Sequence, residues 1–256
     1  MSKYISDEEL NMSKKYIKDE EIRTQLEILH EKKYELKKLI DKKTEKSPYI
    51  VELAGMARTG KTVSTERIFE FFKMANYVVL RTKEPAQIVK ERYDVTKLSN
   101  VDFNDLTLEI SREQLDDCKS KNPDIILQDR GVFDNYIWYQ MMYERGEINF
   151  LTYLSKMENM NDVLKEDDQL YLMTADPEII VARDYSDQIF LEARKKTTIE
   201  GVSKLREGME NLLTRVDSNN IFRIDTSSLT EADTAIRISN GIIDGMTKKL
   251  KKNKNM

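Results

Sequence analysis

One glycine-containing segment constrains the fold of this chain more than any other feature. Residues 55–62 read GMARTGKT and match the phosphate-binding loop pattern G-x-x-x-x-G-K-[ST] at every specified position. The apolar, β-prone run 49–54 precedes it, and residues 63–74 follow with an apolar face at helical spacing that includes Ile68, Phe71 and Phe72. The pattern therefore predicts a buried strand, a phosphate-binding loop and a helix in direct succession.

The chemistry of such a loop follows from its backbone. Glycines let the chain curl so that successive N–H groups point at phosphate oxygens, and the helix N-terminus adds partial positive charge. Lys61 is expected to reach the β- and γ-phosphates, and the Thr62 hydroxyl to bind Mg²⁺. The predicted nucleotide-binding residues are Gly55, Met56, Ala57, Arg58, Thr59, Gly60, Lys61, Thr62 and Val63.

Composition narrows the remaining classes of function. The 256 residues can form one main domain, and a net charge of −4 argues against a nucleic-acid partner held by bulk charge, although a local basic groove stays open. The only cysteine, Cys118, excludes an intrachain disulfide, and we expect it to be buried on a helix. The only histidine, His30, lies far along the chain from the loop. Acid–base catalysis by histidine and zinc sites made of histidine and cysteine are therefore nearly excluded.

Targeting signals are not evident in this sequence. No apolar run approaches the roughly 20 residues of a membrane span, and residues 1–7 lack the apolar centre of a signal peptide. We therefore expect a cytoplasmic protein without a membrane partner.

Strand and helix patterns alternate along most of the chain, which predicts a parallel sheet covered on both faces, a three-layer α/β/α fold. Predicted strands are residues 49–54, 77–82, 124–128, 170–174 and 221–225. Predicted helices are residues 63–74, 105–120, 132–143, 149–164, a helix opening at 176–177, 202–216 and 231–246, with a short helix and loop within 86–104.

The two ends of the chain are expected to lie outside this α/β domain, which spans residues 48–247. Residues 1–47 read as a helical extension, in which Ile22, Leu26, Leu29, Leu36 and Ile40 form an apolar stripe with Lys33 as its one polar member. The extension either packs on the core, docks on a second subunit of a homodimer, or forms a short coiled-coil arm for a partner. Residues 248–256 are predicted to be a flexible basic tail.

Parallel strands place their carboxyl ends at one edge of a sheet, where ligands bind. We therefore expect four segments around one crevice: the phosphate-binding loop, residues 81–85, Asp129-Arg130 and the loop after Thr174. Asp129 ends the third strand, where an acid can organise Mg²⁺ or accept a proton, although an aspartate there can also be a simple cap. Arg130 follows, and its guanidinium can grip two phosphate oxygens. An arginine instead of a water-polarising glutamate favours transfer to a bound acceptor over ATP hydrolysis by a motor.

Several other residues are candidates for catalysis, each with a simpler alternative. Arg58 inside the loop could neutralise charge on the transferring phosphoryl group or pair with a surface acid. Glu84 could position or deprotonate an acceptor hydroxyl or merely end a turn, and Arg183 or Arg194 could belong to a phosphate-covering lid or to a solvated face. An aromatic helix could stack on a planar acceptor or fill the core, and it contains Phe133, Tyr136, Trp138, Tyr139 and Tyr143.

Taken together, these segments resemble the thymidylate kinases and deoxynucleoside kinases over roughly residues 48–246. The shared features, in order, are the loop with its internal arginine, Arg81-Thr82-Lys83-Glu84-Pro85, Asp129-Arg130 with Tyr139-Gln140 beyond, and Asp176-Pro177-Glu178 before Arg183. The resemblance implies a five-stranded parallel sheet with a mobile lid, ATP and Mg²⁺ as the donor, and a nucleoside or nucleotide acceptor. It also implies that Asp129, Arg130 and Arg183 act on phosphates, and that Glu84 contacts or activates the acceptor.

The chain departs from the thymidylate kinases at informative positions. Ala57 replaces the usual aspartate before the loop arginine, Lys83 replaces an arginine, and the N-terminal extension is foreign to both families. The expected activity is therefore a phosphotransferase whose acceptor is a nucleoside, a nucleotide or a similar small molecule. An ATPase switch that signals through the N-terminal arm, and a toxin-like kinase with a sugar-nucleotide or nucleic-acid acceptor, remain alternatives. A GTPase is disfavoured, because the fourth strand is followed by Ala175-Asp176-Pro177 and not by a guanine-reading Asn-Lys-x-Asp motif.

Overall fold

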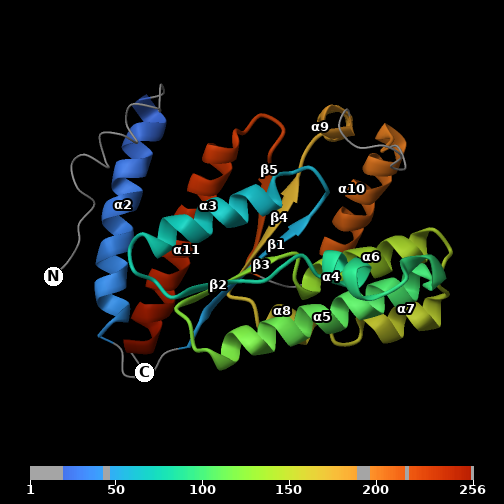
Figure 1. Ribbon diagram of the computed structural model, residues 1–256, viewed down its shortest axis with the longest axis horizontal. Coiled ribbons are helices and arrows are strands. Elements are labelled where there is room, and N and C mark those ends of the chain that lie inside the picture. The colour runs from blue at the N-terminus through green and yellow to red at the C-terminus, as the bar shows by residue number, and fades with distance from the viewer. Residues whose placement is uncertain (1–19, 43–46, 189–196, 217–218, 255–256) are drawn as a thin grey trace.

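A computed structural model describes residues 20–42, 47–188, 197–216 and 219–254. Its centre is a five-stranded, all-parallel sheet in the order β2-β3-β1-β4-β5 (Figure 1). The strands are β1 (Tyr49–Gly55), β2 (Val79–Arg81), β3 (Ile125–Asp129), β4 (Gln169–Thr174) and β5 (Ile221–Asp225). Four of the five coincide with the predicted strands to within a residue, whereas β2 is shorter than the predicted 77–82.

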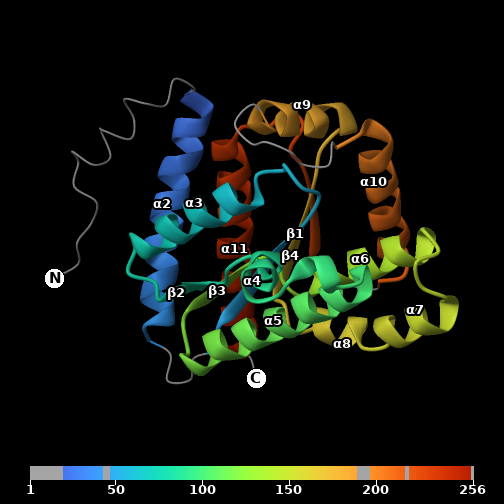
Figure 2. The ribbon, with the colours of Figure 1, turned by 45° about the vertical axis from the view of Figure 1, so that its right-hand side comes forward.

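Helices cover both faces of this sheet, which confirms the predicted three-layer α/β/α architecture (Figures 1 and 2). One face carries α2 (Glu20–Ile40), α3 (Lys61–Lys73) and α11 (Glu231–Lys254). On and around the other face lie α5 (Asn100–Ser120), α6 (Val132–Glu144), α7 (Phe150–Met157), α8 (Met160–Leu164), α9 (Pro177–Gln188) and α10 (Ile199–Leu213). The short α4 (Pro85–Arg92) and the 3₁₀ turn η1 (Val95–Lys97) connect β2 to α5. Within the described residues, none of the helices is both long and apolar enough to span a lipid bilayer.

Strand β1 shows how sequence alternation creates the two layers. Val51 and Leu53 pack with the α2–α3–α11 cluster, whereas Ala54 packs with the cluster around α6. Successive side chains of a strand point to opposite faces, so Glu52 lies on the side of Ala54 and faces α6. The core therefore accommodates a charged residue in the middle of its central strand.

Helix boundaries differ from the predicted ones where capping residues decide them. Helix α5 begins at Asn100, five residues before the predicted start, because Ser99 and Asp102 form a capping box. The predicted helix 149–164 is divided into α7 and α8. Helix α11 continues to Lys254, so the stretch 248–254 that was expected to fray is helical, and the Lys249 ammonium forms an ion pair with Asp168 at 2.7 Å. Cys118 is buried, as expected.

The described part of the N-terminal extension packs on the core. Leu29, Leu36 and Ile40 of α2 are buried in the same cluster as residues of α3 and α11, and α2 packs along α11 (Figure 1). The polar member of the stripe, Lys33, is fully buried: its Nζ donates to the carbonyl of Phe71 at 2.8 Å and lies 3.9 Å from the centre of that ring. Burial lowers the pKa of Lys33 to about 7. Packing on the core is thus the arrangement that the structure supports for residues 20–40.

Candidate active site

The predicted phosphate-binding loop connects β1 to α3 at the carboxyl edge of the sheet. Gly55 has a φ of +115° and lies so close to β4 that a Cβ there would stand 2.4 Å from the carbonyl oxygen of Met173. Gly60 has a φ of +83° and directly precedes α3. Only glycine adopts these conformations without strain, so both glycines of the motif are needed for the backbone path.

The Lys61 side chain folds back into the loop. It is buried, and its Nζ donates to the carbonyl oxygens of Gly55, at 3.1 Å, and of Met56. Burial and the nearby positive charge of Arg130 lower the pKa of Lys61 to about 7. An anion bound in the loop would favour the charged form of this lysine and draw it toward the phosphate oxygens.

Thr62 and Asp129 are brought together, as the metal-site prediction requires. Burial raises the pKa of Asp129, at the end of β3, and the nearby Thr62 hydroxyl opposes that effect. No cluster of three or more acidic, histidine or cysteine side chains suited to a metal occurs among the described residues. This donor set fits Mg²⁺, which proteins usually hold through one or two oxygen ligands together with substrate phosphates and water.

Arg130 links the loop to Glu84, at the start of α4. Its Nη1 donates to the Gly55 carbonyl at 3.1 Å and to Asp134 at 2.7 Å, while its Nε pairs with Glu84 at 3.1 Å. The other oxygen of Asp134 accepts the backbone N–H of Gly55 at 3.0 Å. Arg130, Asp134 and Glu84 therefore form one ion-pair network in direct contact with the first residue of the loop.

Glu52 holds the turn that carries Asp129 and Arg130. Its two carboxylate oxygens accept the backbone N–H groups of Phe133 and Asp134, each at 3.1 Å, at the start of α6. Burial raises the pKa of Glu52 to about 7, against the effect of these hydrogen bonds. The carboxylate leaves no space beyond Gly131, where a Cβ would stand 2.5 Å from Glu52 Oε2. Buried acid and glycine together fix the path of the chain from β3 into α6.

On the α9 side of the loop, two arginines of the predicted site meet. Arg58 has a φ of +60°, and its Nε donates to Asp184 of α9 at 2.9 Å. Arg183 Nη1 donates to the Arg58 carbonyl at 3.1 Å, and its Nη2 donates to the Thr226 carbonyl at 2.8 Å. Arg183 thus contacts the loop backbone itself. Arg194 lies outside the described residues.

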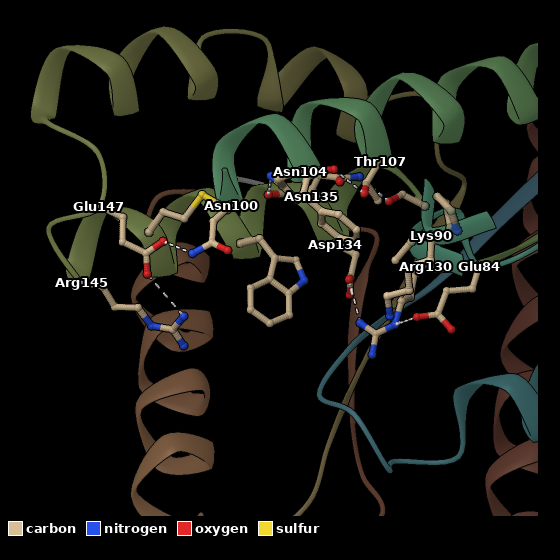
Figure 3. A pocket seen from close by; sticks show the side chains of 16 residues that line it. Glu84, Lys90, Asn100, Asn104, Thr107, Arg130, Asp134, Asn135, Arg145 and Glu147 are labelled. Atoms are coloured by element: carbon tan, nitrogen blue, oxygen red, sulfur yellow. Dashed lines mark hydrogen bonds and ion pairs between the residues drawn. The ribbon is translucent and has the colours of Figure 1, made fainter. Parts of the chain in front are cut away.

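A pocket of about 340 Å³ opens next to Arg130, between α4, α5 and α6 (Figure 3). At one end of the view lie Glu84, Lys90, Arg130 and Asp134. At the other end, Asn100 and Arg145 both contact Glu147. Between these ends, Asn104 Nδ2 donates to the carbonyl of Asn135 at 3.1 Å, and both residues are buried along the pocket wall.

The aromatic helix, α6, fills the core with most of its rings and presents one ring to the pocket. Phe133, Tyr136 and Tyr139 are buried in the hydrophobic core, and Tyr143 packs against that core. Trp138 instead lines the pocket and is 37% exposed. Only this ring of the five is placed where a planar ligand could stack on it.

The structure thus brings five predicted residues to one place, namely Glu84, Lys61, Thr62, Asp129 and Arg130, and puts Arg58 and Arg183 on the α9 side of the loop. Sequence reasoning missed Glu52, Asp134 and Asp184. A charged residue inside an apolar strand was the available signal for Glu52. For Asp134, the signal was its position four residues after Arg130 on a predicted helix, where opposite charges pair. Nothing in the sequence connects Asp184 with Arg58.

Comparison with known proteins identifies the fold. The chain matches no protein-family model and no curated protein sequence. Among solved structures, it is similar to a thymidylate kinase from Candida albicans, with a TM-score of 0.55 and 15% identity, over 81% of this chain and 95% of that one. It is also similar to a deoxyadenosine kinase from M. mycoides, determined with bound dATP, with a TM-score of 0.51 and 17% identity, over 75% of this chain and 98% of that one.

The fold is that of the P-loop nucleoside and nucleotide kinases. This agrees with the resemblance detected in the motifs and with the five-stranded sheet expected from it. In this kinase fold, the described loop, the Asp129–Arg130 turn and the pocket occupy one edge of the sheet, beyond the carboxyl ends of β1, β2 and β3.

Proposed function

We propose that this protein is an ATP-dependent phosphotransferase that moves the γ-phosphoryl group of ATP to a hydroxyl or phosphate oxygen of a small acceptor, a nucleoside, a nucleotide or a similar molecule. The observation that carries the proposal is the position of Arg130, which contacts the Gly55 carbonyl in the loop and Glu84 in the pocket wall. One side chain therefore connects the proposed donor site with an adjacent pocket. An enzyme that only hydrolyses ATP has no need of such a pocket.

Each residue of this arrangement has a role that its chemistry allows. Lys61 and the loop N–H groups bind the donor phosphates, while Thr62 and Asp129 would hold Mg²⁺. Bound Mg²⁺ would supply positive charge to the β- and γ-phosphates. Arg130 steadies the phosphoryl group between the two sites, and Arg58 neutralises charge on it from the loop.

Transfer to a hydroxyl acceptor forms one bond to phosphorus and breaks another. The acceptor oxygen forms a bond to the γ-phosphorus, the bond between that phosphorus and the β–γ bridging oxygen breaks, and ADP leaves with the electron pair. The hydroxyl proton passes to Glu84, whose side chain is 39% exposed at the pocket. Its ion pair with Arg130 aims that carboxylate at the place where donor and acceptor meet.

An acceptor screen tests this proposal. The full chain is incubated with ATP and Mg²⁺ and with nucleosides, nucleoside monophosphates or simple sugars, and ADP and phosphorylated product are quantified. We expect at least one acceptor to raise ADP formation, and Glu84→Gln to lower that rate about 100-fold if this carboxylate is the base. Glu91→Gln, on the exposed side of α4, is the matched control and should change little.

ATP turnover that no acceptor stimulates would contradict the proposal and favour a regulatory ATPase. Phosphorylation of a sugar nucleotide or of a nucleic-acid end would keep the phosphotransferase chemistry but move the protein to the toxin-like alternative.

A further inference from the structure

We propose that Asp184 of α9 is a positioning residue that fixes the side chain of Arg58 in the phosphate-binding loop for phosphoryl transfer. This inference rests on the proposed function, because it assigns a purpose to the loop arginine during transfer. It adds a residue that lies 126 positions away in sequence from the one it holds.

The Asp184 carboxylate binds groups from two different segments of the chain. Its Oδ1 accepts a hydrogen bond from Arg58 Nε at 2.9 Å, and its Oδ2 accepts one from the Thr197 hydroxyl at 2.5 Å. Asp184 is only 7% exposed, and the Arg58 side chain is 26% exposed. The carboxylate is therefore largely shielded from water and the guanidinium partly so. A charged hydrogen bond is stronger in such surroundings than in bulk water.

The neighbouring residue secures the backbone of the same loop position. Arg183 donates to the Arg58 carbonyl and to the Thr226 carbonyl, and the Thr226 N–H in turn donates to the Thr174 carbonyl at 2.8 Å. Two successive residues of α9 thus hold the main chain and the side chain of Arg58, and they tie both to the ends of β4 and β5. Helix α9 is a fixed neighbour of the loop at this point.

Arg58 needs such support for two reasons. Its backbone has a φ of +60°, a left-handed conformation that non-glycine residues rarely adopt unless surrounding contacts impose it. Its side chain is long and flexible, so ordering it during the reaction would cost entropy. A preformed ion pair orders the side chain before the reaction begins. The carboxylate of Asp184 supplies the contact that selects one orientation.

Burial of Asp184 also indicates whether its removal should lower or raise the rate of transfer. If Arg58 swung away, a carboxylate shielded from water would lose a short hydrogen bond to a cation, which is unfavourable. Asp184 therefore keeps Arg58 in its place beside the loop and does not serve as a temporary holding site. Removing Asp184 is expected to lower the rate of transfer and not to raise it.

A double-mutant cycle tests this proposal. The wild type, Asp184→Ala, Arg58→Ala and the double variant are compared by kcat and by the KM for ATP. We expect Arg58→Ala to lower kcat about 100-fold and Asp184→Ala roughly tenfold, with the KM for ATP changed less than about threefold. Because Asp184 acts through Arg58, the double variant should be no slower than Arg58→Ala alone.

Two further variants separate positioning from stability. Asp184→Asn keeps an oxygen that can accept from Arg58 Nε, so it should recover part of the lost kcat. Tyr185→Ala changes the next residue of α9, which is 70% exposed, and should leave kcat unchanged. Losses that multiply in the double variant, or an increase in kcat for Asp184→Ala, would overturn the proposal.

A readout independent of catalysis distinguishes failure of this inference from failure of the proposed function. If the wild type phosphorylates no acceptor, the proposed function falls, but amide hydrogen exchange of residues 55–62 still reports on the loop. Asp184→Ala should speed exchange there roughly tenfold, and the double variant should exchange no faster than Arg58→Ala. Unchanged exchange in Asp184→Ala would refute the positioning role.

Discussion

Two buried lysines, one in the phosphate-binding loop and one between α2 and α3, show how little burial alone says about function. Lys61 and Lys33 are 5% and 0% exposed, and burial lowers the pKa of each to about 7. Both donate to backbone carbonyls, Lys61 to Gly55 and Lys33 to Phe71. Measured by burial, charge and hydrogen bonding, they are the same kind of residue.

Their surroundings separate them. Lys61 lies within the electrostatic reach of Arg130, Asp134, Asp129 and Glu84, in the loop that we propose binds the donor phosphates. Lys33 lies over the ring of Phe71, and its own carbonyl accepts the Tyr77 hydroxyl at 2.7 Å. A perturbed pKa becomes a sign of function only where other charged groups converge on the same place. The α2–α3 interface is accordingly structural.

The largest expected difference between the loop and the α2–α3 interface is the loss of activity when the buried lysine of each is replaced. Lys61→Ala should lower kcat at least about 1,000-fold, because the donor phosphates lose their main cationic partner in a water-poor site. Lys33→Met should retain activity within about twofold, since Met fills a similar volume and Lys33 contacts α3 at Phe71, near the end of the helix away from the loop. ADP formation with the acceptor found in the screen measures both.

The free energy of unfolding of Lys61→Ala should lie within about 1 kcal/mol of the wild-type value, so that a loss of activity cannot be ascribed to a loss of structure. Normal ATP turnover by Lys61→Ala would show that the site is assigned wrongly. A large loss in Lys33→Met, with the fold intact, would erase the functional distinction between the two lysines.

Much of this comparison can be predicted from the sequence. The loop pattern, with a strand before it and a helix after it, predicted the positions of Lys61, Thr62 and the fold class, since these depend on local periodicity and on glycines. Parallel-strand geometry then predicted that Glu84 and Asp129-Arg130 would converge on the loop. Helical spacing in residues 22–40 identified Lys33 as the one polar residue in an apolar stripe, but it could not show what Lys33 contacts.

What the sequence could not show depends on contacts between distant segments. Glu52 and Asp184 bind groups that lie 81 and 126 positions away, and no local pattern encodes those pairings. The start of α5 at Asn100 was missed for a different reason, because the Ser99–Asp102 capping box outweighed the apolar periodicity that suggested residue 105. The N-terminal helix was treated as an extension because its partners, α3 and α11, are separated from it in the chain.

The next largest effect tests whether α2 belongs to the core. Leu36→Ala should lower the free energy of unfolding by about 3 kcal/mol, because Leu36 is 2% exposed between α2 and the main core cluster. Leu39→Ala, on the exposed side of the same helix at 41%, is the matched control and should cost less than about 1 kcal/mol. Urea unfolding measures both; equal, small losses would mean that α2 is an independent arm.

The smallest expected effect is the dependence of stability on the protonation of Lys33. Lys33 has a folded pKa of about 7 and an unfolded value of 10.5, so the unfolded chain binds more protons between these values. Stability that depends on neutral Lys33 is present above pH 10.5 and is lost as the pH falls toward 7. The free energy of unfolding of the wild type should therefore rise relative to Lys33→Met between pH 7 and pH 9, by up to about 1.4 kcal/mol per pH unit.

Lys61 also has a lowered pKa, but it is present in both proteins, so its contribution cancels when the free energy of unfolding of Lys33→Met is subtracted from that of the wild type. Urea unfolding at pH 7, 8 and 9 gives the difference directly. A difference that does not change with pH would mean that Lys33 stays charged in the folded protein, held by the Phe71 ring and carbonyl. The two buried lysines would then differ in protonation as well as in surroundings.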